Sequence, residues 1–213
     1  MEMKTDIRWY DTVESTNDEA RRLIEGLDNL SVIAARCQTA GRGQGDHKWH
    51  SRSGENLTFS VVLKFSEGSA PGGGEGLLAP LAARDALLIT QTVTLALRLY
   101  LLEKGVKARI KWPNDIYVDG LKICGILIEN ILHGPQVAAS IVGIGLNLNQ
   151  SDFPSDLPNP VSLSLLTGST YNPESELVRF REILCECAEK TNTAEGRRYL
   201  DEVFSEYMFR LPS

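Results

Sequence analysis

Cysteine and histidine are scarce in this sequence, with four cysteines and three histidines among 213 residues. The cysteines lack the paired spacing of a zinc site and are too few for a disulfide framework in a chain of this length: Cys37, Cys124, Cys185 and Cys187. We therefore expect reduced thiols and a cytoplasmic location. The histidines have no nucleophile partner within a recognisable motif: His47, His50 and His133.

An excess of positive charge is also missing, because the net charge is −6. This balance argues against general nucleic-acid binding and against a polybasic membrane anchor. No run approaches the roughly 18 apolar residues of a membrane-spanning helix, and residues 1–13 lack the apolar core of a secretory signal. We expect neither DNA nor a membrane as a partner. The length and the 42% hydrophobic content suit one globular domain.

Several well-known catalytic motifs are absent. The glycine run at 72–76 has no lysine behind it, so a Walker A loop is excluded. Two near-matches to the dinucleotide fingerprint fail because their third glycine is replaced by Asp46 and by Leu148. There is no GxSxG elbow and no HExxH zinc motif. The remaining chemistry is the handling of anions by glycine backbone, cations and amides.

Hydrophobic patterning predicts an α+β fold, a mixed β-sheet covered by helices. Thr16 followed by Glu19 resembles a capping box at the start of the first helix. Asp119-Gly120 has the composition of a two-residue hairpin turn. A flexible loop is expected at 67–76. Strands are expected at 6–13, 31–38, 57–65, 107–114, 116–131 and 137–149, and helices at 15–27, 80–105, 173–191 and 195–209.

A glycine-rich, basic loop stands out in this acidic chain, with the sequence GRGQGDHKWHSRSGENLTFS at 41–60. Glycine at 41, 43 and 45 allows a ligand to approach backbone N–H groups. Arg42 offers a planar fork of donors that suits a carboxylate or a phosphate. An ordinary surface loop is the alternative interpretation.

Three further segments have both a structural and a functional interpretation. STN at 15–17 is typical of a helix cap. KWPND at 111–115 is typical of a strand end with a proline turn. GLNLN at 145–149 is typical of a strand end whose side-chain amides form hydrogen bonds with their own backbone. Their combination favours a site. Lys122 supplies a mobile charge, while Asn114 and Asn147 are neutral groups able to face hydrated Mg²⁺ or phosphate.

The motifs STN, GRGQGDHKW, KWPND, KICGIL and GIGLNLN, in this order, resemble the catalytic domain of biotin protein ligases. The resemblance covers about Ser15 to Asn149. It implies the catalytic fold shared with class II aminoacyl-tRNA synthetases. It also leads us to expect a single catalytic domain over 1–213, without the N-terminal DNA-binding domain or the C-terminal small β-barrel found in some members.

The resemblance implies a two-step reaction. Biotin and ATP, with Mg²⁺, give biotinyl-5′-AMP, and a lysine of a biotin carboxyl carrier domain then takes the biotin. The expected partner is that domain of acetyl-CoA carboxylase or of a similar carboxylase. The resemblance implies no tightly bound cofactor, and it allows a homodimer.

The resemblance also assigns roles to individual residues. The catalytic pair is Lys122 and Arg42. The biotin-binding set is Ser15, Thr16, Asn17, Gln38, Gly41, Arg42, Gly43, Gln44, Lys122 and Gly125. The ATP-binding set is His47, Trp49, Lys111, Asn114, Lys122 and Asn147. Asn114 and Asn147 are also the candidate contacts for the magnesium of Mg-ATP.

Two positions depart from the family pattern. Many members have arginine at the place of Gln44 and a second basic residue at the place of His47. One alternative is a lipoate or octanoate ligase of the same fold, which would lack the paired GRG…W and KWPND motifs. Another is a non-catalytic biotin- or nucleotide-binding protein. The retention of the charged set argues against this alternative.

Overall fold

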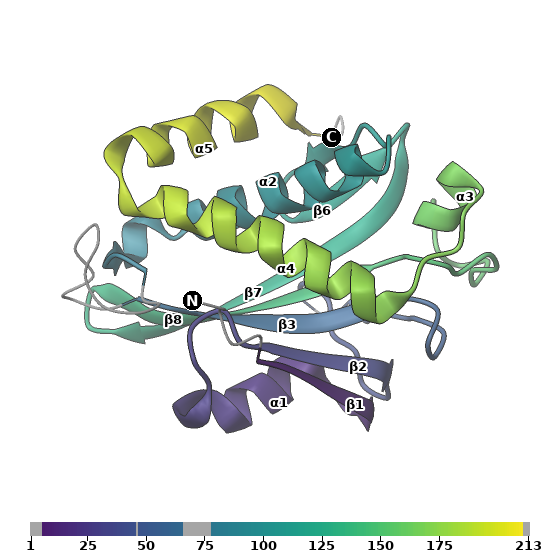
Figure 1. Ribbon diagram of the computed structural model, residues 1–213, viewed down its shortest axis with the longest axis horizontal. Helices are drawn as coiled ribbons and strands as arrows, with labels where there is room; N and C mark the ends of the chain where they lie inside the picture. The colour runs from purple at the N-terminus through teal and green to yellow at the C-terminus, as the bar shows by residue number, and fades with distance from the viewer. Residues whose placement is uncertain (1–5, 46, 66–77, 211–213) are drawn as a thin grey trace.

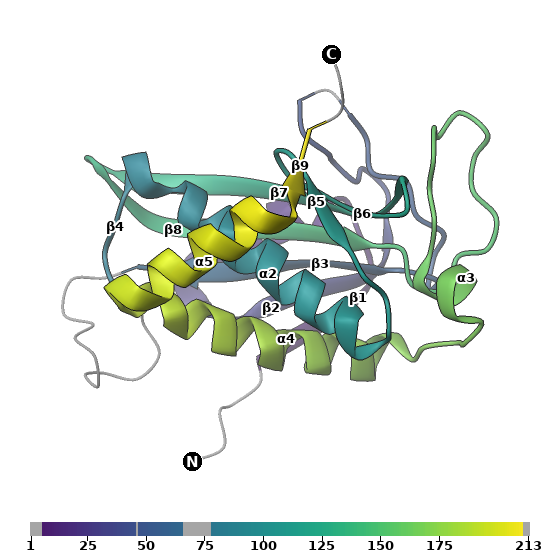
Figure 2. The ribbon, with the colours of Figure 1, turned by 90° about the horizontal axis from the view of Figure 1, so that it is seen from above.

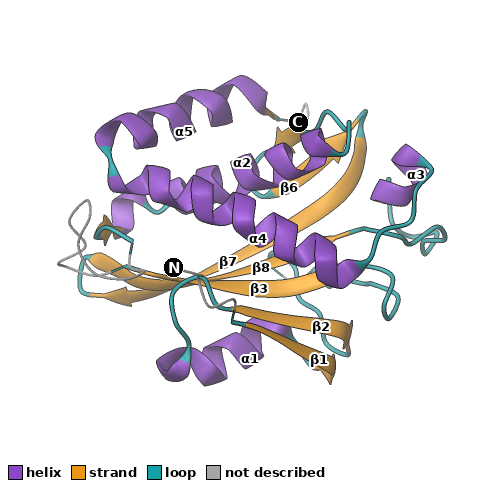
Figure 3. Ribbon diagram, viewed as in Figure 1, coloured by secondary structure: helices purple, strands orange, loops and turns teal. Residues whose placement is uncertain are grey.

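The computed structural model describes residues 6–210 except 46 and 66–77, so the loop expected at 67–76 lies outside the described residues. Within this range, nine strands form one sheet with helices on both faces (Figures 1 and 3). The strands are β1 (Ile7–Val13), β2 (Val32–Gln38), β3 (Leu57–Lys64), β4 (Leu81–Ala82), β5 (Arg109–Lys111), β6 (Asp115–Val118), β7 (Leu121–His133), β8 (Gln136–Leu146) and β9 (Met208–Phe209). The α-helices are α1 (Thr16–Leu23), α2 (Leu87–Glu103), α3 (Leu163–Thr167), α4 (Pro173–Glu189) and α5 (Ala194–Tyr207).

The sheet is mixed, as the sequence predicts. Its order is β1-β2-β3-β8-β7-β6-β5-β9, with the short β4 pairing to β8. β1 and β2 pair in parallel, as do β5 and β9, and the other pairs are antiparallel. The long β7–β8 hairpin occupies the centre of the sheet. Neighbouring strands on both sides therefore hold the residues of its exposed face in place.

The two faces of the sheet have different coverings. On one face, α2, α4 and α5 cover the main hydrophobic core (Figures 1 and 2). On the other face, α1 covers only part of the sheet, over a small cluster that includes Ala20, Ile33 and Val62. Because side chains alternate along a strand, Phe59 faces the main core while its neighbour Ser60 faces α1. The uncovered part of this second face is where the pocket lies.

The segment Ala83–Glu103, which contains α2, is long and apolar enough to resemble a membrane span by length and composition. Most of it is buried in the main core, with Val93, Leu97 and Leu101 fully enclosed. Packing against the sheet and against α4 and α5 therefore accounts for its apolar character.

The hairpin turn is confirmed, whereas two predicted helix starts are wrong. Asp119 and Gly120 both have positive φ, 49° and 83°, as a two-residue turn requires. The capping box is wrong because Ser15, not Thr16, occupies the N-cap, and its side chain makes no capping hydrogen bond. The region from residue 80 is strand β4 and a 3₁₀ turn, Ala83–Asp85, before α2 begins at Leu87.

Candidate active site

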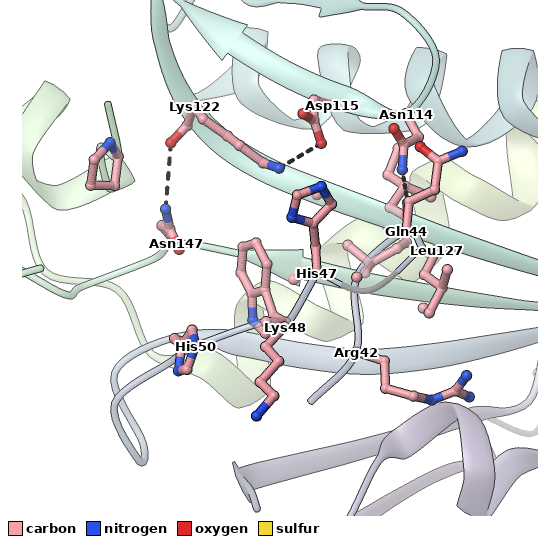
Figure 4. A pocket seen from close by; sticks show the side chains of 18 of the residues that line it. Arg42, Gln44, His47, Lys48, His50, Asn114, Asp115, Lys122, Leu127 and Asn147 are labelled. Atoms are coloured by element: carbon pink, nitrogen blue, oxygen red, sulfur yellow. Dashed lines mark hydrogen bonds and ion pairs between the residues drawn. The ribbon is translucent and has the colours of Figure 1, made fainter. Parts of the chain in front are cut away.

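A pocket of about 470 Å³ opens on the sheet face beside α1, within the range of ordinary ligand sites. Its walls come from the start of α1, the loop after β2, the KWPND segment, the β7–β8 hairpin and residues 153–160. Every residue assigned a role from the sequence lines this pocket, apart from Gly41, which borders an adjoining hollow. Figure 4 shows the side chains converging from these separate elements.

Glycines form the floor of the pocket. Gly125 of β7 lies directly opposite Gly145 of β8, and Gly143 lies two residues away on the same face. A Cβ on Gly145 would overlap the indole ring of Trp49, and a Cβ on Gly143 would overlap the amide of Asn17. The glycines therefore let two side chains lie against the sheet backbone.

The pocket extends along the hairpin. Leu127, opposite Gly143, is next to Asn17, whereas Lys122 and Asn147 lie at the far end. The backbones of Leu127 and Lys122 are five residues apart, roughly 16 Å at the usual rise of a strand, and the Lys122 side chain reaches back toward Gly125, where Nζ lies 3.5 Å from the position that a Cβ would take. The pocket thus has two ends, one beside α1 and one beside Lys122.

The end beside α1 is a wall of neutral polar groups. The side-chain oxygen of Gln38 accepts hydrogen bonds from Thr16 N (2.8 Å) and from Thr16 Oγ1 (3.1 Å). Ser60 Oγ lies 2.7 Å from Thr16 Oγ1 and 2.6 Å from Asn17 Oδ1. Thr16, Asn17 and Ser60 are each almost fully buried. This network explains why Thr16 does not cap its helix, because its hydroxyl is engaged with β2 and β3.

Arg42 does not point along the floor toward Lys122. Its guanidinium forms a two-pronged contact with Glu129 of β7 (3.0 and 3.1 Å) and a further ion pair with Asp18 of α1 (2.7 Å). Figure 4 shows this side chain directed away from Lys122. The arginine therefore anchors the glycine-rich loop to α1 and β7, and its predicted contact with a ligand stays a prediction.

Glu129 is ionised in this setting. Burial by itself raises the pKa of a carboxyl group, but hydrogen bonds from Arg42 and Asn17 outweigh it and lower the pKa of Glu129 from its usual 4.5. Asn17 Nδ2 donates to Glu129 Oε2 over 2.8 Å. One carboxylate thus connects the buried polar wall to the basic loop.

The opposite end of the pocket is cationic. Lys122 Nζ lies 2.7 Å from Asp115 Oδ1, and Lys111 Nζ lies 3.9 Å from the other oxygen of the same carboxylate. The Lys122 side chain is 34% exposed, so its ammonium group is accessible from the pocket. Two lysines around one carboxylate leave a net positive charge, which favours an anionic ligand here.

The two predicted amides are fixed by their nitrogen atoms. Asn114 Nδ2 donates to the carbonyl of Ile126 (2.6 Å), and Asn147 Nδ2 donates to that of Val161 (3.0 Å). Neither amide oxygen accepts a hydrogen bond from the described residues. No group of three or more histidine, cysteine, aspartate or glutamate side chains in that part of the chain could hold a metal. Asp115 and the amide oxygens suit a magnesium ion that arrives with phosphate ligands.

The loop over the pocket folds back on itself. Gly43 N donates to the carbonyl of His47 (2.7 Å), and Trp49 N donates to that of Gly41 (3.0 Å). Gly45 has φ of 63°, which favours glycine at this turn. The side chains of Gln44 and His47 are exposed along the pocket edge (Figure 4). Trp49 Nε1 is buried and has no hydrogen-bond partner among the described residues.

Sequence reasoning missed three polar residues of the site. Asp115 lies inside the quoted KWPND motif, where its carboxylate faces Lys122. Ser60 and Glu129 lie within segments for which the sequence predicts strands and no functional role. Alternation along β7 could have identified Glu129, because it shares a face with Gly125 and Leu127.

Residues 9–147 match the family described as the biotin/lipoate A/B protein ligase family. The biotin–[acetyl-CoA-carboxylase] ligase of Paracoccus denitrificans is 35% identical over 169 residues, covering 77% of this chain and 65% of the relative. The bifunctional ligase/repressor BirA of Bacillus subtilis is 34% identical over 164 residues, covering 75% and 46%. The chain thus spans between about half and two thirds of the length of these relatives.

Solved structures have the same fold. The Aquifex aeolicus biotin protein ligase in complex with biotin and ATP superposes with a TM-score of 0.74, at 26% identity, over 97% of this chain and 79% of that one. The Leishmania major biotin protein ligase in complex with biotin also has a TM-score of 0.74, at 24% identity, over 98% and 86%. The catalytic fold expected from the motifs is therefore confirmed. With a family match over most of its length and the same arrangement of sheet and helices, the chain belongs to the biotin/lipoate A/B protein ligase family.

Proposed function

We propose that this protein is an ATP-dependent biotin protein ligase. The observation that supports this most strongly is the two-ended pocket, which joins a neutral hydrogen-bonding wall at Asn17 to a cationic end at Lys122. Biotin has a neutral ureido ring at one end and a carboxylate at the other, so it matches this polarity. Relatives named as biotin ligases, and a solved relative that binds biotin and ATP, favour the same substrates.

The proposed first step joins two anions. A carboxylate oxygen of biotin attacks the α-phosphorus of ATP, the bond to pyrophosphate breaks, and biotinyl-5′-AMP forms. In the second step the amine of an acceptor lysine attacks the acyl carbon, and AMP leaves. Neither step needs a nucleophile from the enzyme, which agrees with the motifs that the sequence lacks. The chain's task is to fix the reacting groups in line and to offset their charge.

Lys122 is the residue best suited to offset that charge. In our proposal its ammonium exchanges Asp115 for the biotin carboxylate and then for the α-phosphate. Lys111 would offset the remaining phosphate charge, and the indole of Trp49 would support the nucleotide. Arg42 would order the loop, with a ligand contact requiring release from Glu129.

Magnesium enters the proposal as part of the Mg-ATP substrate. Asp115, Asn114 and Asn147 offer hard oxygen atoms, and magnesium commonly takes only one or two protein ligands beside phosphate and water. The acceptor would be a biotin carboxyl carrier domain, as the name of the Paracoccus relative suggests. A cytoplasmic setting is consistent with the four cysteines, all of which are free thiols. A homodimer also remains part of the proposal.

The test is pyrophosphate release from Mg-ATP with biotin, lipoate, octanoate or no acid. We expect release with biotin alone. Release with lipoate or octanoate instead would overturn the choice of substrate while keeping the adenylation chemistry. Calorimetric binding of biotin without any release would replace the ligase with a binding protein.

A further inference from the structure

Glu129 lies outside the set of residues assigned from the sequence, yet it contacts two of them. Its Oε2 accepts from Asn17 Nδ2 (2.8 Å) and from Arg42 (3.0 Å), while its Oε1 accepts from Arg42 (3.1 Å) and lies 3.6 Å from Arg21 Nη2. Its side chain is only 22% exposed. A carboxylate can satisfy all these donors together, because both of its oxygens accept hydrogen bonds.

Glu129 is the nearer of two acceptors that set which way the Asn17 amide faces, the other being the Leu127 carbonyl, which lies 3.4 Å from the same Nδ2. An amide offers an acceptor on one side and donors on the other, and an ionised carboxylate can only accept. The NH₂ group of Asn17 must therefore face Glu129, and Oδ1 must face Ser60 and the floor at Gly143. Asn17 is 3% exposed, so water cannot compensate for the opposite orientation.

We propose that Glu129 is the positioning residue that makes Asn17 present a hydrogen-bond acceptor to the pocket, and so selects a ligand with an N–H donor. The ureido ring of biotin has such donors, whereas the dithiolane of lipoate and the alkyl chain of octanoate have none. This inference rests on the proposed function and identifies a cause of its substrate preference.

Glutamine at position 129 would have the same shape but could not serve both neighbours. The guanidinium of Arg42 requires the single amide oxygen, which turns the new NH₂ group toward Asn17. Two NH₂ groups then face each other, and rotation of Asn17 relieves this at the cost of its longer hydrogen bond to the Leu127 carbonyl (3.4 Å), which turns NH₂ toward the pocket. We expect Glu129→Gln to weaken biotin binding by about tenfold or more, the usual cost of a mismatched buried polar group.

A double variant that exchanges the amide and the carboxylate between positions 17 and 129 distinguishes this role from simple anchoring of Arg42. In the double variant Asn17→Asp/Glu129→Gln, the glutamine donates to the new carboxylate and keeps its oxygen for Arg42. An acceptor again faces the pocket, so biotin affinity should recover to within a few fold of the original protein. Asn17→Asp alone places two carboxylates against each other and should bind biotin poorly.

The experiment is calorimetric titration of biotin and octanoate into the original protein, both single variants and the double variant. Glu103→Gln is the matched control, because Glu103 makes a comparable two-pronged pair with Arg179 between α2 and α4, away from the pocket (3.0 and 2.6 Å). We expect the control to bind biotin normally and octanoate binding to be unchanged in Glu129→Gln. The biotin affinities of the single and double variants should follow the order given above.

Two results would overturn the inference while leaving the proposed function intact. One is Glu129→Gln binding biotin as tightly as the original protein. The other is a double variant no better than Glu129→Gln, which would mean that Glu129 only anchors the loop. Failure of the original protein to bind biotin would overturn both proposals, and it is visible in the first titration.

Discussion

At the residue scale, the pocket depends on charges that face partners within the fold. Lys122 has Asp115 as its partner (2.7 Å), and Arg42 has Glu129 (3.0 Å). The sequence singled out both cations, Arg42 as a fork of donors in a glycine-rich loop and Lys122 as a mobile charge within a family motif. It did not predict the carboxylates, because a single acidic residue in a strand carries no pattern of its own.

Removing the Lys122 ammonium should abolish most of the adenylation rate. Lys122→Ala should lower biotin-dependent pyrophosphate release by about 10²–10³-fold, the usual loss of one preorganised charge contact. The fold should survive, since the side chain is 34% exposed and lies outside the core. A pyrophosphate-release assay measures the rate, and a melting curve tests whether the fold is intact. Turnover close to normal would mean that the lysine has been misassigned.

The lowered pKa of Glu129 predicts a specific dependence of stability on pH. A carboxyl whose pKa is lower in the folded state than its unfolded value of 4.5 stabilises the protein above that pH. This contribution is lost as the pH falls through the lower, folded-state value. Urea titrations give the free energy of unfolding of the original protein and of Glu129→Gln. The difference between these two free energies should therefore become smaller as the pH falls from about 7 to about 3. A gap that stays constant over this range would contradict the ion-pair assignment.

At the scale of elements, long and strongly patterned segments were predicted well and short ones were not. Strands β7 and β8 and helices α4 and α5 lie where residue composition and helical spacing predict them, whereas the pairing of β7 with β8 was not predicted. Helix α3 and strand β9 span five and two residues, too few for any period to appear. The predicted cap at Thr16 was wrong because its hydroxyl contacts Gln38 of β2, a tertiary contact that local sequence cannot reveal.

The glycine floor belongs to this scale, and one substitution tests it. Gly145→Ala would place a methyl group where the Trp49 indole lies. Because Trp49 belongs to a loop, the loop should move aside, and pyrophosphate release should fall at least about tenfold with little change in melting temperature. Gly26→Ala is the matched control, since a Cβ there meets nothing within 4 Å. Equal activity of the two variants would show that the close packing of Trp49 is dispensable.

At the scale of the whole molecule, one sheet performs two tasks on its two faces. The face under α2, α4 and α5 holds the main core, and the face partly covered by α1 holds the pocket. Residues from 15 to 160 meet there, because the central hairpin connects the end of the pocket beside α1 to the end formed by the KWPND and GLNLN segments. The order of motifs indicated the family, whereas the distances and partners within the pocket depend on tertiary structure.

The most direct test of the ligase assignment is to look for the intermediate itself. The protein would be mixed with biotin and Mg-ATP, without an acceptor, and analysed by mass spectrometry for biotinyl-5′-AMP. We predict that this adenylate forms in the original protein and is strongly reduced in Lys122→Ala. Its absence from the original protein, with the fold intact, would contradict the assignment.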